Sequence, residues 1–186
     1  MTILGALWLP IVLSAVFVFL LSAILHMVLK YHNSDYGKLP NEDAVRAAFQ
    51  GVNAEARGYV VPHCPDMKDM QSPEMQKKYV EGPIAVMYLR RPGVPGMGQS
   101  LLQWFLFCLV ISLFVGYVAA HAIPPGVDYL HVFRIVGAVG FLAYGVGQIS
   151  ASIWMAKPWS VAAKEAFDGL LYGLVTAGTF GWLWPK

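Results

Sequence analysis

Four long apolar runs dominate the chain and are separated by more polar stretches. They cover about residues 3–29, 101–122, 129–151 and 165–184. An α-helix needs roughly 20 consecutive, mostly apolar residues to cross the hydrocarbon core of a bilayer, and each run meets that length. The pattern therefore predicts an all-α integral membrane protein with four transmembrane helices.

The first apolar run is expected to be kept as an anchor and not removed as a signal peptide. No Lys or Arg precedes its apolar core, the core is too long, and no small-x-small cleavage site follows it. Pro10 lies about two turns into this run, where a proline can kink a helix. We therefore count residues 3–29 as the first span.

Residues 31–98 form the long polar segment between the first and second spans, and they are expected to form a soluble insert. Within it, LPNEDAVRAAFQG predicts a helix capped by Asn41, and SPEMQKKYVEG predicts a second helix capped by Ser72. A short extended run at 59–61 follows the first helix, and PIAVMYLRR follows the second. The insert is therefore predicted to be a small α+β unit.

Charge sets the expected topology of the chain. Only 13% of its 186 residues are charged, compared with about 25% in a soluble domain. Of the 13 Lys and Arg residues, nine lie between Lys30 and Arg91, and the loop HAIPPGVD has none. Because basic loops stay in the cytoplasm, we expect a cytoplasmic insert with the N-terminus and C-terminus outside.

Aromatic and basic side chains near the span ends are expected to anchor the helices at the two membrane surfaces. Arg134 lies only about 8 Å past Tyr129 along a helix, so it can reach the outer headgroups. The alternative for Arg134 is a transport role, because an ionisable residue inside a span is a functional hypothesis. The predicted anchoring set is Arg134, Trp154, Trp159, Trp182 and Trp184.

Small residues recur every four positions in the last two spans. The fourth span carries Gly169, Gly173, Ala177 and Gly181, and the third carries Ala143, Gly147 and Ala151. Such faces let two membrane helices approach closely. We expect the third and fourth spans to form a tight antiparallel hairpin, although the same faces can also meet another protein.

The loop YVVPHCPDMKDM gathers soft metal ligands. Thiolate and thioether sulfurs suit Cu(I), and imidazole suits several metals. The candidate metal ligands are therefore His63, Cys64 and Met67. His32, near the inner end of the first span together with His26, is the candidate that can approach this loop from elsewhere.

The same loop has a structural interpretation, which we favour. Pro62 and Pro65 flank the His–Cys pair, and adjacent residues on an extended chain point to opposite faces. A stiff corner between a strand and a helix is expected, so no cofactor is predicted unless this loop binds a metal.

Polar groups near the inner end of the fourth span have two interpretations. Lys164 and Asp168 are four residues apart, so they can form an ion pair on the helix surface. Asp168 can instead contact Arg90 or Arg91 of the insert. We favour the surface cluster.

The middles of the four spans carry no ionisable residue, and no catalytic constellation is evident. Ion-coupled transporters usually need ionisable groups near the midplane. The leading prediction is a non-catalytic accessory or scaffold protein that packs within a larger membrane assembly. The alternative is a membrane protein that handles a metal or small molecule at His63 and Cys64, and the third is a neutral-solute permease using Tyr144 and Gln148.

Three segments, YHNSDYGKLPNEDAV, RRPGVPGMGQSLLQWF and FDGLLYGLVTAGTFGWLWP, resemble a family of small multi-span bacterial inner-membrane proteins with no assigned activity. The resemblance implies a location in the bacterial inner membrane and carries over no functional site. Expected partners are the lipid bilayer and other membrane subunits or further copies of the chain. Nucleic acid is not expected, because acidic residues interleave with the basic residues of the insert.

Overall fold

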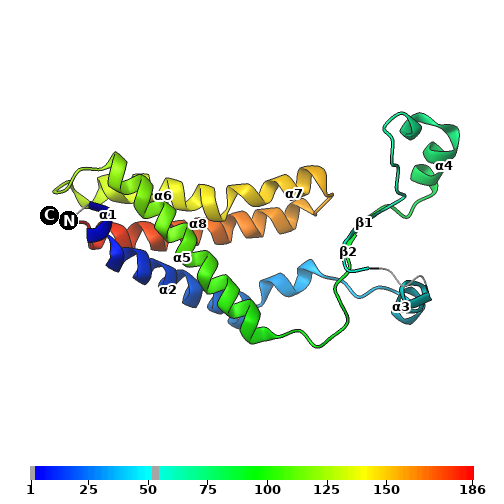
Figure 1. Ribbon diagram of the computed structural model, residues 1–186, viewed down its shortest axis with the longest axis horizontal. Coiled ribbons are helices and arrows are strands. Elements are labelled where there is room, and N and C mark those ends of the chain that lie inside the picture. Colours follow the sequence, from blue (N-terminus) through cyan, green and yellow to red (C-terminus); the bar gives the residue numbers. More distant parts are fainter. Residues whose placement is uncertain (1–2, 52–54) are drawn as a thin grey trace. The chain divides into compact units, whose positions relative to one another are not determined.

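The computed structural model describes residues 3–51 and 55–186, which form two compact units. Unit 1 contains residues 1–36 and 96–186, and unit 2 contains residues 37–95. Each unit is coloured by sequence position in Figure 1. The predicted insert began at residue 31, whereas the structure assigns residues 31–36 to unit 1.

Unit 1 is a bundle of helices. α1 is Ile3–Ala6 and α2 is Trp8–Ala23, which continues through the π-helical η1, Ile24–Val28. After the short 3₁₀-helix η2, Tyr31–Asp35, the unit resumes at α5, Met97–Ala122. It ends with α6 (Tyr129–Tyr144), the 3₁₀-helix η4 (Val146–Gln148), α7 (Ile149–Trp154) and α8 (Trp159–Trp182).

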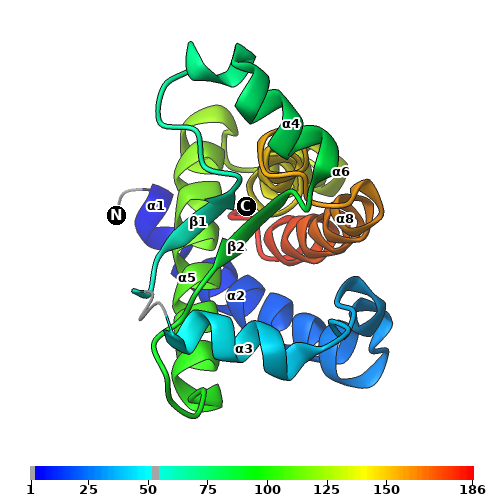
Figure 2. The same cartoon turned by 90° about the vertical axis from the view of Figure 1, so that its right-hand side faces the viewer.

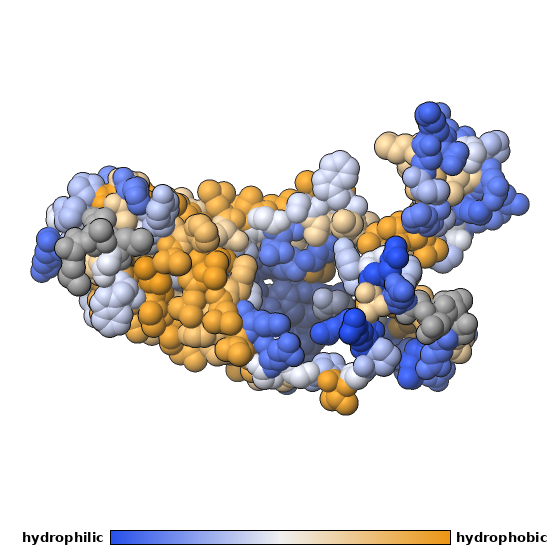
Figure 3. All heavy atoms as spheres, viewed as in Figure 1, coloured by the Kyte–Doolittle hydropathy of each residue, from blue (hydrophilic) through white to orange (hydrophobic). Residues whose placement is uncertain are grey.

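Three helical stretches of unit 1 are long and apolar enough to cross a membrane: Trp8–Val28, Met97–Ala122 and Tyr129–Trp154. This confirms the expectation of a mostly helical protein with membrane-length helices. α8 has 24 residues but is more polar, because its first half carries Lys164, Glu165 and Asp168. Figure 3 shows apolar side chains covering the middle of unit 1 on the face that displays α2 and α5.

The core of unit 1 is apolar and includes Val18, Val115, Val132, Val136, Ala177 and Phe180. Polar side chains in it are paired between helices. Ser14 Oγ donates to Ser112 Oγ at 3.0 Å, and Trp104 Nε1 donates to Ser22 Oγ at 2.7 Å. Hydrogen bonds of this kind help to hold membrane helices together, because lipid tails compete for apolar contacts. They tie α2 to α5.

α6 and α8 make the closest helix contact in the bundle and run side by side in Figures 1 and 2. A Cβ on Gly173 would lie 2.8 Å from the backbone nitrogen of Phe141, and one on Gly169 would lie 2.3 Å from Cα of Gly145. A Cβ on Gly140 would lie 3.1 Å from Cα of Gly173. The two backbones therefore touch, and a side chain at Gly169 or Gly173 would force them apart.

The rest of the predicted α8 face also lies in this contact. Ala177 is buried and opposes Gly137, and a Cβ on Gly181 would lie 2.8 Å from the ring of Tyr129. α8 thus presents Gly169, Gly173, Ala177 and Gly181 to α6.

The face of α6 that meets α8 differs from the predicted one. Ala143 and Gly147 are exposed, Ala151 is half-buried, and nothing lies within 4 Å of a Cβ placed on Gly147. A four-residue step drifts around a helix of 3.6 residues per turn. In addition, α6 ends at Tyr144 and η4 changes the phase of the helix before α7 begins. The contact therefore uses Gly137, Gly140, Phe141 and Gly145.

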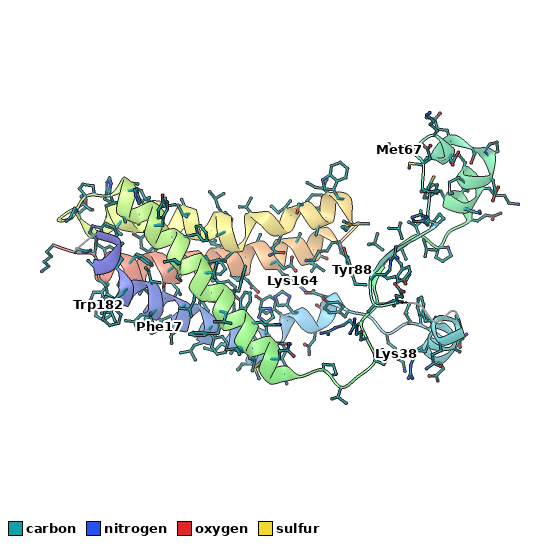
Figure 4. All side chains as sticks on the ribbon, in the orientation of Figure 1. Phe17, Lys38, Met67, Tyr88, Lys164 and Trp182 are labelled. Carbon is teal, nitrogen blue, oxygen red and sulfur yellow. The ribbon has the colours of Figure 1, made fainter. Side chains whose placement is uncertain are left out.

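The predicted anchoring residues fall into two groups. Arg134, Trp154, Trp159 and Trp182 are exposed. Trp184 is buried, and its Nε1 donates to the carbonyl of Pro124 at 3.1 Å. Trp184 therefore ties the end of the chain to the loop between α5 and α6 and does not face lipid. Figure 4 shows Trp182 and Lys164 towards opposite ends of the bundle.

Unit 2 has the predicted order of helix, strand, helix and strand. α3 is Glu42–Gly51, β1 is Gly58–Val61, α4 is Pro73–Glu81 and β2 is Ala85–Tyr88, with a 3₁₀ turn η3 at Asp69–Gln71. The two strands are antiparallel, with Gly58 opposite Tyr88 and Val61 opposite Ala85. Ser72 caps α4, since its Oγ accepts from the Met75 amide at 3.3 Å.

Gly173→Leu is expected to lower the stability of unit 1 by about 1–3 kcal/mol or more, because a side chain at this contact forces the two backbones apart. Thermal unfolding of the purified protein in detergent measures this effect. Gly147→Leu is the matched control, since it places the same side chain on open space. Equal melting temperatures for the two variants would contradict the contact.

Candidate functional site

Asp168 of α8 is the centre of a polar cluster at one end of unit 1. Its side chain is 5% exposed. The Tyr31 hydroxyl donates to Oδ1, and Oδ2 lies 2.9 Å from His32 Nε2 and 3.8 Å from His26 Nε2. The cluster therefore joins α8 to the segment that follows α2.

Local backbone geometry brings the two histidines together. His26 lies in η1, where α2 widens into a π-helix, a feature that is frequent at functional sites. Lys30 then adopts a left-handed conformation with φ of 52°, which reverses the chain into η2. As a result the His26 and His32 rings stack, with centroids 4.5 Å apart and an angle of 7° between their planes.

The Nδ1 atom of each histidine faces an acceptor. His26 Nδ1 lies 3.0 Å from the Ser22 carbonyl, which can only accept, so Nδ1 carries the proton. His32 Nδ1 lies 2.6 Å from Asp35 Oδ2. When both Nδ1 atoms donate, the neutral rings keep their lone pairs on Nε2. A carboxylate or carbonyl behind a histidine in this way commonly orients it as a metal ligand.

Lys164 fixes the carboxylate behind His32. Its Nζ donates to Asp35 Oδ1 at 2.5 Å, to Ser34 Oγ at 2.8 Å and to the Tyr31 carbonyl at 3.0 Å. The hydrogen bond from Lys164 lowers the pKa of Asp35, with a smaller contribution from His32. Asp35 is therefore held as an acceptor for His32.

These contacts correct the expectation for the start of α8. Lys164 was expected to pair with Asp168 on the helix surface, but it reaches Asp35 on η2 instead. Asp168 is buried and is engaged by Tyr31 and His32 within unit 1. Both side chains thus point across the helix interface to the returning η2 segment.

The ligand atoms of His26, His32 and Asp168 all lie within 4.8 Å of one another. Ligands on one tetrahedral zinc ion with bonds of about 2.0–2.1 Å lie about 3.3 Å apart. The His26 side chain is half-exposed, so it has freedom to close the longer separations. When both Nδ1 atoms donate, two Nε2 lone pairs and a carboxylate oxygen converge, and a cation between them removes their mutual repulsion. Without a cation, the 2.9 Å contact of His32 Nε2 with Asp168 Oδ2 is a hydrogen bond from the ring.

A cavity of about 510 Å³ borders the cluster between α2, α5, α6 and α8. His26 and Asp168 contribute to its wall, as do the aromatic side chains of Phe19, Trp104, Tyr144 and Tyr172. Tyr144 and Gln148, the residues predicted to line a solute cavity, also lie on its wall. The cluster is thus reachable from a space that can hold a small molecule.

The other predicted metal ligands lie in unit 2. His63 is exposed, Met67 is 82% exposed, and Cys64 Sγ donates to the Asp66 carbonyl at 3.0 Å. His32 belongs to unit 1, where Asp35 and Asp168 already contact both of its ring nitrogens. A metal site at His63, Cys64 and Met67 stays a prediction.

Sequence reasoning named His32 as a metal ligand but missed its partners. Asp168 is 136 residues away and Asp35 lies on a turn that no periodicity reveals. The available signal was the placement of Asp168 inside an apolar run, since a buried charge in a membrane helix needs a partner.

A scan against protein-family models, a search of curated proteins and a search of solved structures found nothing that matches the chain. The geometry of the cluster and of its cavity therefore carries the functional assignment.

Proposed function

We propose that the protein is a membrane protein that handles a divalent transition-metal ion at His26, His32 and Asp168. The observation that supports this most directly is the orientation of the two imidazoles. Acceptors face both Nδ1 atoms, and both Nε2 atoms lie near the Asp168 carboxylate, where a metal ion would take their lone pairs. This is the arrangement of a metal-binding histidine pair with oriented rings.

The donor set favours Zn²⁺ and related borderline metals. Two imidazoles and one carboxylate are typical ligands of Zn²⁺ and of non-haem Fe²⁺, whereas Ca²⁺ and Mg²⁺ prefer oxygen ligands. Three protein ligands leave a fourth position for water or another molecule. An open fourth position is typical of a site that binds an exchangeable ligand, whereas a structural zinc site uses four protein ligands.

The alternative to a metal ion in this cluster is an additional proton on His32. If His32 is an imidazolium, both of its nitrogens donate, one to Asp35 and one to Asp168. In that case the cluster is a buried ion-pair network that fastens η2 to α8. Direct metal analysis separates the two occupants.

The membrane arrangement is part of the proposal. Four spans in the bacterial inner membrane place the N-terminus and the C-terminus outside and unit 2 in the cytoplasm. The three apolar helices and the basic composition of residues 30–91 support this arrangement. α8 is the fourth span in this proposal, since its 24 residues are about 36 Å long, enough to cross the membrane.

A second candidate is the non-catalytic accessory role within a membrane assembly. The glycines of α8 that favoured the accessory role pack against α6 of the same chain. The observation that still favours it is the exposed pair Ala143 and Gly147, small residues at which another helix can approach closely.

Zinc titration of metal-free protein is expected to show one ion bound per chain. Removal of a ligand in His32→Ala or Asp168→Asn is expected to abolish that binding, as measured by competition with a chromophoric chelator and by metal analysis after desalting. His121→Ala is the matched control, because His121 is an exposed histidine on α5 outside the cluster.

The same titration tests the alternative metal site. The double variant with His63→Ala and Cys64→Ser is expected to retain full zinc binding. Loss of binding in that variant, with retention in His32→Ala, would move the site to unit 2. No binding in the wild-type protein would leave the proton as the occupant.

Asp35→Asn is expected to weaken zinc binding by about 10–100-fold without abolishing it, because the residue orients His32 and does not bind the ion. The apparent zinc affinity is the measurement. Asp43→Asn provides the control, since Asp43 is an exposed aspartate of unit 2. An affinity equal to wild type would show that Asp35 has no positioning role.

A reporter enzyme that works only outside the cytoplasm is expected to be active when it is fused after Trp184. A reporter that works only in the cytoplasm is expected to be inactive there, because four spans return the chain to the outer side. A reporter inserted in the α4 region of unit 2 is expected to behave in the opposite way. Cytoplasmic activity of the first fusion would exclude the four-span arrangement.

A further inference from the structure

The cavity beside the polar cluster of His26, His32 and Asp168 has the size of a ligand site. It holds about 510 Å³, and small-molecule sites measure about 300–1,000 Å³. Met27 and Met97 on its wall are exposed, so the cavity opens to the surface of unit 1. Its lining therefore indicates which class of small molecule can bind there.

The walls of the cavity are aromatic. The Tyr144 and Tyr172 ring centroids are 5.5 Å apart, and those of Trp104 and Tyr172 are 6.2 Å apart. Trp104 Nε1 already donates to Ser22, and the Tyr144 hydroxyl donates to the Cys108 carbonyl at 3.5 Å. These two side chains therefore offer the cavity apolar ring surface and no free donor.

Two of the residues that line the cavity carry a polar atom without a partner. Among the residues that the structure describes, the Tyr172 hydroxyl and Glu165 Oε2 are buried and form no hydrogen bond. Tyr172 is only 4% exposed, and Glu165 uses its other oxygen to accept from Lys157. Leaving such groups unpaired costs about 1–3 kcal/mol each. A ligand with a hydroxyl group can pair with both.

We propose that this cavity binds a hydroxyl-bearing aromatic amphiphile of the hydroquinone or alkylphenol class. Its hydroxyl hydrogens supply a donor for Glu165 Oε2 and its hydroxyl oxygens supply an acceptor for Tyr172, while its ring lies among the aromatic walls. Met27 and Met97 are exposed residues on the wall, and they give an apolar tail a path out of the cavity.

Charge on the wall selects against other amphiphiles. Glu165 and Asp168 both line the cavity, so a phosphate or carboxylate head group meets like charge. Lys157 already pairs with Glu165, so a neutral donor satisfies that carboxylate without a cationic group. A strongly polar neutral solute, as in the permease hypothesis, would leave the aromatic walls without apolar contacts.

The cavity proposal stands apart from the metal proposal. Tyr172 and Glu165 are not among the proposed metal ligands, whereas His26 and Asp168 belong to both regions. A bound head group would therefore sit next to the metal cluster, but its two hydrogen bonds do not need the ion.

Two probes that share a ring and a tail test the proposal: decylhydroquinone and its dimethyl ether, in which each hydroxyl is replaced by a methoxy group. Calorimetric titration of chelator-treated protein, in detergent under reducing conditions, is expected to show saturable binding of the hydroquinone. The ether has the same ring and tail but no hydroxyl, and it is expected to bind at least about tenfold more weakly. Equal affinities would mean apolar partitioning only and would overturn the proposal.

Tyr172→Phe provides the protein side of the test. It is expected to weaken hydroquinone binding about tenfold and to keep or raise the melting temperature of the ligand-free protein. The gain in stability follows from removing a buried hydroxyl that has no partner among the described residues. The ether oxygen can also accept from Tyr172, so ether binding is expected to weaken as well. Unchanged hydroquinone affinity, or a lowered melting temperature, would contradict the role of this hydroxyl.

Tyr117→Phe is the matched control, because Tyr117 is an exposed tyrosine on α5. If Tyr172→Phe does not fold, the comparison of the two probes on wild-type protein still decides the proposal. His32→Ala is expected to lose zinc but keep hydroquinone binding. Failure of the metal site and failure of the cavity site therefore give different results.

Discussion

The contact between α6 and α8 is the constraint on which the rest of unit 1 depends. Lipid tails compete for apolar side chains, so membrane helices gain stability mainly by close packing and by hydrogen bonds between them. Here the packing reaches its limit, because Gly140, Gly145, Gly169 and Gly173 let the two backbones touch. This contact fixes the rotation of α8 about its axis.

Once α8 is fixed in rotation, its polar residues can point in only one direction. Lys164 and Asp168 are four residues apart and lie on one face, as do Asp168 and Tyr172. That face meets η1 and η2, where the chain has turned back at Lys30. The carboxylate of Asp168 is therefore buried against the two histidines, and Lys164 is held over Asp35.

The cluster and the cavity together account for polar groups that a simple helical scaffold does not need. A buried carboxylate is costly unless charges and hydrogen bonds compensate it. Tyr31 donates to Asp168, and His32 Nε2 lies 2.9 Å from it, where either a proton or a metal ion compensates the charge. About one turn away along α8, the Tyr172 hydroxyl and one oxygen of Glu165 have no hydrogen-bond partner in the part of the chain that the structure describes. Unpaired buried groups of this kind are expected where a ligand completes a site.

The sequence by itself determined the membrane class, the helical and strand segments and the small-residue face of α8, because hydropathy and local signals act over short stretches. It did not determine which face of α6 opposes that run, since the break after Tyr144 shifts the helix phase. It also offered candidate metal ligands in the His63–Cys64 loop, where soft ligands are adjacent in sequence, although it favoured a structural corner there. Only the tertiary structure brought His26, His32 and Asp168 together. Their convergence depends on a left-handed turn at Lys30 and on the rotation of a helix more than 130 residues later, and neither leaves a periodic trace in the sequence.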